Sequence, residues 1–255
     1  MNTIKKIVAL GDSITKGVIY DGESYKILPD GFVSQCAENM NVDIDNYSRM
    51  GCTISRGTQI AEQHADAIAG SDLTLVEFGG NDSDFCWTDI ASAPTDNHYP
   101  MTELPTFRQM YRDLIARIRQ LGSKPILMTL PLIDYRRFYD FVTRNMGEQD
   151  RSNVLSWLGG QEERIRNYHD MYSLAVYQIG YQERVPVLDI TSPFLHNRDY
   201  LPYLCVDGIH PSQQGHDLIA CSVMNQLQRI LPQMEDFSID AGTTDNSWRC
   251  SRCRQ

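Results

Sequence analysis

Short apolar stretches alternate with longer segments of helical periodicity along this chain. Aliphatic and β-branched stretches predict five strands, at residues 4–10, 42–47, 73–78, 126–130 and 185–190. Apolar positions three and four residues apart predict helices at residues 32–40, 54–68, 104–121, 162–179 and 213–231. Because strands and helices alternate, we expect right-handed crossovers and a mainly parallel five-stranded sheet with helices on both faces.

Two connections between these elements are longer than usual turns. Residues 82–103 contain prolines and many polar positions, and residues 132–160 are rich in aromatic side chains. Long connections in a compact domain are often lids or binding loops, although the second could equally be a further helix packed on the core. We therefore expect one domain over residues 1–234 with two insertions, followed by a polar, loosely attached tail over residues 235–255.

Composition excludes several classes of function. The chain has 255 residues, a formal net charge of -10 and a pI near 5.0. An acidic chain repels phosphate backbones, so no nucleic-acid partner is expected, and the pair Arg136-Arg137 is interpreted as a solvated surface. No apolar stretch has the length that spans a bilayer, so no membrane association is expected.

The cysteines and histidines predict neither a disulfide framework nor a metal site. The seven cysteines are odd in number and mostly isolated in apolar surroundings, which is typical of reduced thiols. The start of the chain lacks the features of a signal peptide, so we expect a cytoplasmic protein. The single pair Cys250 and Cys253, and the spacing of His210 and His216, match no standard zinc pattern.

Reactive residue types follow four of the predicted strands, where ligands bind in an open parallel sheet. Ser13 follows the first strand, Gly51 the second, Asn81 the third, and Asp207 with His210 the fifth. A serine nucleophile needs a base such as His210, and that base needs an orienting carboxylate such as Asp207. The resulting oxyanion needs donors, for which the backbone N–H groups of Ser13 and Gly51 and the Asn81 amide are suitable.

Each of these residues also has an ordinary structural role when taken singly. Ser13 is a typical helix N-cap, Gly51 a turn glycine, and Asn81 a turn residue. Asp207 could cap the last helix, and His210 could be a satisfied loop histidine. Only their joint occurrence at successive strand ends favours a catalytic site.

Taken together, the motifs resemble the conserved blocks of the SGNH, or GDSL-type, hydrolases. The matching segments are Gly11-Asp12-Ser13-Ile14-Thr15, the block around Gly51, Gly79-Gly80-Asn81-Asp82 and Asp207-Gly208-Ile209-His210-Pro211. Isoleucine stands at position 14 where the family more often has leucine. The resemblance runs from about residue 4 to the last helix and implies a flavodoxin-like, three-layer α/β/α sandwich that needs no cofactor.

The resemblance also implies a role for each matching residue. Ser13 would be the nucleophile and first oxyanion donor, Gly51 and Asn81 would complete the oxyanion hole, and His210 and Asp207 would be the base and its orienting acid. Members of this family include carbohydrate acetylesterases, lysophospholipases, thioesterases and arylesterases. The resemblance therefore defines the chemistry more closely than the substrate.

We accordingly expect a serine-dependent esterase of small or short-acyl esters, with a carbohydrate acetyl ester as one candidate. Asp12, Asp82, Tyr135 and Phe138 are candidate substrate contacts. Two alternatives stay open: a noncatalytic carbohydrate- or acyl-binding module on the same scaffold, and a thioesterase or acyltransferase with the same triad. The sequence also leaves open whether the protein is a homo-oligomer.

Overall fold

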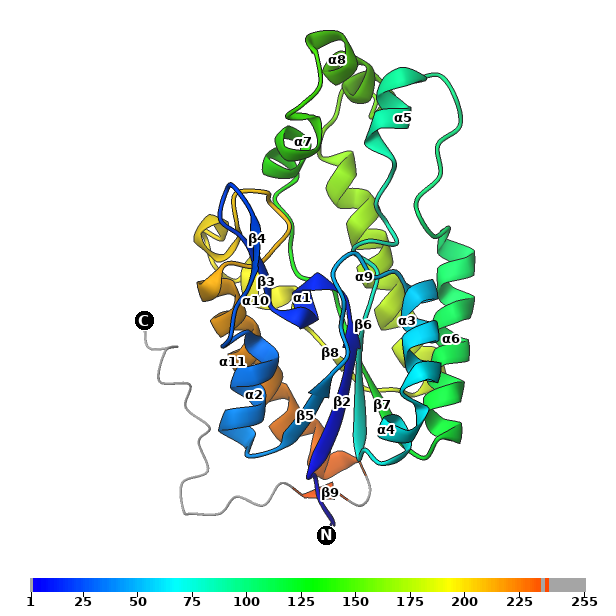
Figure 1. Ribbon diagram of the computed structural model, residues 1–255, viewed down its shortest axis with the longest axis vertical. Coiled ribbons are helices and arrows are strands. Elements are labelled where there is room, and N and C mark those ends of the chain that lie inside the picture. The colour runs from blue at the N-terminus through cyan, green and yellow to red at the C-terminus, as the bar shows by residue number, and fades with distance from the viewer. Residues whose placement is uncertain (1, 235–236, 239–255) are drawn as a thin grey trace.

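A parallel sheet of five strands lies between two layers of helices in the computed structural model, which describes residues 2–234 and 237–238 (Figure 1). In spatial order the strands are β5 (Asp43–Asn46), β2 (Lys6–Gly11), β6 (Leu73–Glu77), β7 (Lys124–Met128) and β8 (Val187–Leu188). Each neighbouring pair is parallel. The predicted α/β fold with its five-stranded parallel sheet is therefore confirmed.

Helices cover both faces of the sheet because successive strand residues point to opposite sides. In β2, Ile7 and Ala9 face one cluster of buried side chains, whereas Val8 and Leu10 face the other. Helices α2 (Phe32–Met40) and α11 (Gln213–Ile230) cover the first face. The second face is covered by α3 (Ile54–Gln63), α4 (Ala65–Ala69), α6 (Leu104–Gln120) and α9 (Arg164–Glu183).

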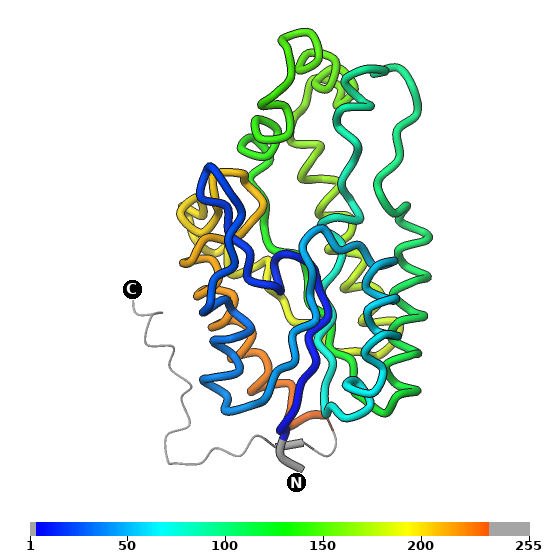
Figure 2. Tube along the Cα trace, viewed as in Figure 1, coloured from blue at the N-terminus to red at the C-terminus, as the bar shows by residue number. Residues whose placement is uncertain are grey.

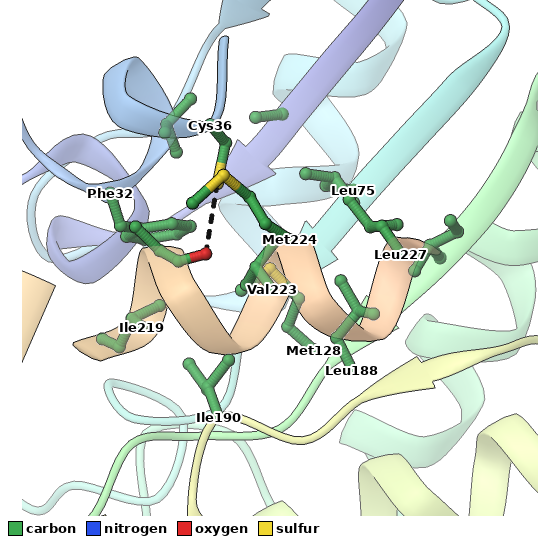
Figure 3. Close-up of a cluster of buried hydrophobic side chains, with 14 of the residues drawn as sticks. Phe32, Cys36, Leu75, Met128, Leu188, Ile190, Ile219, Val223, Met224 and Leu227 are labelled. Carbon is green, nitrogen blue, oxygen red and sulfur yellow. Dashed lines mark hydrogen bonds between the residues drawn. The ribbon is translucent and has the colours of Figure 1, made fainter. Parts of the chain in front are cut away.

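The first of these clusters joins α2 and α11 to the middle of the sheet (Figure 3). Its labelled members are Phe32 and Cys36 from α2, Ile219, Val223, Met224 and Leu227 from α11, and Leu75, Met128, Leu188 and Ile190 from the strands or their ends. Each of these labelled residues is at most 3% exposed. This packing anchors α11, which follows the loop that carries Asp207 and His210.

One predicted helix is divided in the structure. The expected helix over residues 54–68 consists of α3 and α4, which meet at His64. His64 has φ -116° and ψ 27°, outside the helical region, and its ring stacks on Tyr47 with centroids 3.7 Å apart. Apolar periodicity continues through the break, so it could not be read from the pattern.

The two long insertions fold together into a structure that we call the cap, residues 82–103 and 132–160. It contains α5 (Trp87–Ser92), α7 (Tyr135–Thr143) and α8 (Glu148–Trp157). Figure 2 shows the cap beyond the end of the sheet that also bears α1 (Ser13–Lys16). Its buried cluster includes Phe85, Trp87, Phe138 and Val154, and Ile165 of α9 joins the same cluster. The second insertion is thus helical and packed.

The remaining elements are short. A hairpin of β3 (Val18–Tyr20) and β4 (Tyr25–Ile27), which the sequence pattern did not predict, lies beside the loop that carries His210. Strands β1 (Asn2–Thr3) and β9 (Phe237–Ser238) pair in parallel, and α10 (Ser192–Leu195), η1 (Leu201–Tyr203) and η2 (Leu231–Gln233) complete the chain. Most of the predicted tail, including Cys250 and Cys253, lies outside the described residues.

Two of the expectations drawn from composition can be compared with the structure. Over residues 2–234 and 237–238, no helix combines the length and apolarity needed to cross a bilayer. Cys52, Cys86 and Cys205 are free thiols, but Cys221 is disulfide-bonded, so the expectation of reduced thiols is wrong there. Disulfides are uncommon in the cytoplasm, and the cytoplasmic location stays a prediction.

Candidate active site

Ser13 lies where strand β2 turns into the short helix α1. The side chain of Asp12 caps this helix, because its Oδ1 accepts a hydrogen bond of 2.8 Å from the Ile14 backbone N–H. Ser13 is therefore the first helical residue and not the cap. The turn places the Ser13 side chain, 6% exposed, at the carboxyl end of the sheet.

His210 and Asp207 lie in the loop between η1 and α11, and His210 reaches Ser13 directly. His210 Nε2 is 2.9 Å from Ser13 Oγ, and His210 Nδ1 is 2.7 Å from Asp207 Oδ2. The other Asp207 oxygen accepts the backbone N–H groups of Ile209 and His210. With Nδ1–H donated to Asp207, the lone pair on Nε2 is available for the serine proton. The three side chains thus form a triad-like arrangement.

Two candidate backbone donors, those of Ser13 and Gly51, belong to residues that line the same cavity. Gly51 lines the cavity beside Ser13 in the loop after β5, and its φ of +68° favours glycine. A Cβ at this position would meet nothing within 4 Å, so backbone conformation and not crowding explains the glycine. Neither the Gly51 nor the Ser13 backbone N–H donates a hydrogen bond to the residues that the structure describes.

The Asn81 amide is held by two acceptors. Its Nδ2 donates to Asp12 Oδ2 at 2.9 Å and to the Cys52 carbonyl at 3.3 Å. A side-chain amide has two N–H donors, so both are committed. Donation to an oxyanion requires that Asn81 release one bond, and the bond to Cys52 is the longer.

A second carboxyl that we did not identify from the sequence lies beneath this site. Glu77 ends β6, is 1% exposed and lies beside the Asp12 carboxyl, and its Oε1 accepts no hydrogen bond from the described residues. Its Oε2 accepts the Thr15 hydroxyl at 2.9 Å. Burial, and then the charge of Asp12, raise the pKa of Glu77 well above its usual value. We infer that neutral Glu77 donates to the Asp12 carboxylate. The sequence signal that could have identified Glu77 was a glutamate at the end of a mostly apolar strand.

Asp12 is consequently the centre of a buried hydrogen-bond network. Its carboxyl is 2% exposed and contacts Ile14, Asn81 and Glu77. Burial raises the pKa of Asp12, while these hydrogen bonds and the nearby His210 lower it in part. The sequence suggested Asp12 as a substrate contact. It lines the cavity, but its hydrogen bonds point to the support of Ser13 and Asn81.

A cavity of about 260 Å³ extends from Ser13 and His210 into the cap. Phe138 lines it, as the sequence suggested. Asp82 and Tyr135 are not among its lining residues. Both Asp82 oxygens accept the Ile54 backbone N–H at the start of α3, and the Tyr135 ring lies against Arg136 and Arg166. These contacts give Asp82 and Tyr135 structural partners, and their role as substrate contacts stays a prediction.

Further residues line the cavity. Tyr25, from the unpredicted hairpin, meets the His210 ring with centroids 5.2 Å apart. Asp84, Trp87, Tyr168 and His169 come from the first insertion and α9. Within the described ranges, no group of three or more His, Cys, Asp or Glu side chains is arranged to hold a metal ion.

Comparison with known proteins identifies the family. Residues 9–218 match the GDSL-like lipase/acylhydrolase family. A GDSL esterase/lipase from Arabidopsis thaliana is 24% identical over 223 residues, which are 86% of this chain and 77% of that protein.

Solved structures share the fold. A lipase/acylhydrolase from Enterococcus faecalis is 22% identical with a TM-score of 0.63, over 89% of this chain and 97% of that one. A catalytic mutant of an acetylxylan esterase from Geobacillus stearothermophilus is 21% identical with the same TM-score, over 89% and 95%. Since the family match spans most of the chain and the triad-like geometry agrees with it, the protein belongs to the GDSL-like lipase/acylhydrolase family as a GDSL-type esterase/acylhydrolase.

Proposed function

We propose that the protein hydrolyses a short-acyl carboxylic ester through an acyl-enzyme on Ser13. The observation that carries this proposal is the continuous hydrogen-bond chain from Asp207 through His210 to Ser13 Oγ, with distances of 2.7 and 2.9 Å. All three side chains are at most 6% exposed. Burial excludes competing water from these bonds and strengthens them.

The reaction follows from the positions of these atoms. Ser13 Oγ attacks the ester carbonyl carbon while His210 Nε2 takes the hydroxyl proton. The tetrahedral intermediate collapses, the alcohol leaves with the proton held on His210, and an acyl ester on Ser13 remains. Water then attacks this ester, again deprotonated by His210, and the acid is released with Ser13 restored. Asp207 stabilises the imidazolium in both steps.

Negative charge on the former carbonyl oxygen needs preorganised donors. The uncommitted N–H groups of Ser13 and Gly51 are suitable, and the Asn81 amide adds a third donor when it releases the Cys52 carbonyl. One such donor typically contributes about 10²- to 10³-fold to kcat. Asp12, supported by Glu77, keeps the Asn81 side chain beside Ser13 through the shorter bond.

The candidate substrate is an acetyl ester of a carbohydrate. The cavity, at about 260 Å³, is just below the roughly 300–1,000 Å³ of usual small-ligand pockets, which favours a small ester. Two relatives in fold, from Geobacillus stearothermophilus and a second protein described as an acetyl xylan esterase, act on acetylated xylan by name. Aromatic lining residues such as Trp87 and Phe138 are compatible with a sugar ring.

Hydrolysis of p-nitrophenyl acetate tests the nucleophile. Ser13→Ala is expected to reduce kcat by on the order of 10⁴-fold or more, and His210→Ala by a comparable factor, because triad members act as a unit. Ser92→Ala, in an exposed position on α5, is the matched control. Equal rates for the wild type and Ser13→Ala would refute the assignment. Product analysis with competing alcohol and thiol acceptors separates hydrolysis from acyl transfer.

A further inference from the structure

The cavity has a polar feature that the triad does not use. Most of its lining within the cap and the adjoining helix α9 is apolar, with side chains from Phe85, Trp87, Phe138, Phe141, Ile165 and Tyr168. Asp84 and His169 line the same cavity. Asp84 follows β6 in the first insertion, and His169 lies on α9. Two different segments of the chain thus bring a carboxylate and an imidazole to one apolar pocket.

His169 is buried, and one nitrogen of its ring lacks a hydrogen bond. Its side chain is 7% exposed, and its Nδ1 has no hydrogen-bond partner among the described residues. The nearest recorded carboxylate atom, Asp170 Oδ1, is 3.7 Å from Nδ1, which is too far for a hydrogen bond. Buried polar groups are satisfied in most native structures, so an unpaired ring nitrogen on a residue that lines the cavity calls for a functional explanation.

Asp84 is fixed in place and retains acceptor capacity. Its Oδ1 accepts the Trp87 indole N–H at 2.8 Å. A carboxylate offers about four lone-pair positions, so further hydrogen bonds can form. Burial raises the pKa of Asp84 to about 6, and the nearby His169 opposes this increase. At neutral pH the group is therefore mainly an ionised acceptor.

We propose that Asp84 and His169 form a hydroxyl-binding pair that recognises a free hydroxyl group of the ester substrate inside the cavity. A hydroxyl both donates and accepts, so it can donate to the Asp84 carboxylate and accept from an imidazole N–H. The flat rings of Trp87 and Tyr168 would contact the apolar part of the same group. The inference rests on the proposed esterase function, and it adds the substrate class.

The hydroxyl could belong to either half of the ester. In a partly acetylated sugar it would be on the alcohol half, whereas in a hydroxylated acyl chain it would be on the acyl half. The first arm of the experiment compares monoacetylated methyl xyloside with its di-O-methyl ether. The second compares p-nitrophenyl 6-hydroxyhexanoate with p-nitrophenyl 6-methoxyhexanoate. In each arm the measured quantity is the ratio of kcat/KM for the hydroxylated ester to that for its methylated counterpart.

In the wild type we expect this ratio to be about tenfold or more in one of the two arms, because methylation removes a donor to a charged acceptor. His169→Phe and Asp84→Asn are each expected to reduce it severalfold. His98→Phe is the matched control, since His98 also lies in the cap but does not line the cavity. The control should keep the wild-type ratio.

A wild-type ratio near one in both arms would overturn the inference without need of any variant. A high ratio that persists in both His169→Phe and Asp84→Asn would overturn the assignment to this pair. Failure of the esterase proposal is seen separately, as equal p-nitrophenyl acetate turnover by the wild type and Ser13→Ala. A fluorophosphonate label on Ser13 verifies that each variant is folded around its active site.

Discussion

Replacement of Glu77 with glutamine tests the protonation of the buried carboxyl beside Asp12. Glu77 is 1% exposed, accepts the Thr15 hydroxyl and contacts Asp12. Glutamine has nearly the same shape: its amide N–H can donate to Asp12 as the neutral carboxyl does, and its carbonyl can accept from Thr15. The Glu77→Gln variant therefore imitates the protonated glutamate at every pH.

The magnitude follows from proton linkage. An unfolded glutamate has a pKa of about 4.3, whereas the pKa of Glu77 in the fold is well above the ordinary value. The folded protein thus holds the proton at pH values where the unfolded chain has lost it. Between the two pKa values Glu77 reduces the free energy of unfolding by about 1.4 kcal/mol for each pH unit of increase. The Glu77→Gln variant lacks this loss.

Urea unfolding at several pH values from 5 to 8 measures the effect. We expect the free energy of unfolding of Glu77→Gln, minus that of the wild type, to increase with pH by up to about 1.4 kcal/mol per pH unit. The other groups that interact with the pair, namely Asp82, Tyr111 and His210, are present in both proteins and cancel to first order. Glu62→Gln, where an exposed carboxylate pairs with Arg117, is the control and should lack the slope. Parallel curves for wild type and Glu77→Gln would refute the protonated assignment.

Three further changes have defined outcomes. Asp82→Ala removes the acceptor for the Ile54 N–H, so a loss of about 0.5–2 kcal/mol in the free energy of unfolding is expected in urea titrations. Gly208→Ala places a Cβ 2.5 Å from the Asp134 carbonyl at φ +79°. It should cost about 1–3 kcal/mol or more and reduce kcat for p-nitrophenyl acetate. Burial lowers the pKa of His216 to about 4, so its imidazole gains a proton less readily in the folded protein than in the unfolded chain. Stability should thus fall by up to about 3 kcal/mol from pH 6.5 to 4, and His216→Gln should lack this part in pH-dependent melting.

The parts of the fold that could be predicted are those with a strong periodic signal. Strands such as β2 and β6 are buried on both faces, so their sequences are mostly apolar. The candidate site residues at the strand ends could also be predicted, because parallel strands place Ser13, Asn81 and His210 at one edge of the sheet. Sequence order and topology sufficed to bring these residues together.

The remaining features depend on tertiary contacts that leave no local pattern. The hairpin of β3 and β4 is too short for a periodic signal, yet it supplies Tyr25 beside His210. Asp82 and Tyr135 have residue types suited to substrate binding, and the sequence could not show that they do not line this cavity and have partners within the fold. His169 is part of a predicted helix in the sequence, and only the packing of the cap against α9 reveals that its Nδ1 has no hydrogen-bond partner among the described residues.

The acyl-enzyme itself is the most direct test of the account. The wild type is mixed with p-nitrophenyl acetate, quenched in acid, digested and examined by peptide mass spectrometry. We expect an acetyl group on the peptide that contains Ser13, formed in a burst of p-nitrophenol of at most one equivalent and absent from Ser13→Ala. Turnover without this adduct, at a rate that Ser13→Ala retains, would contradict the central claim that Ser13 is the nucleophile.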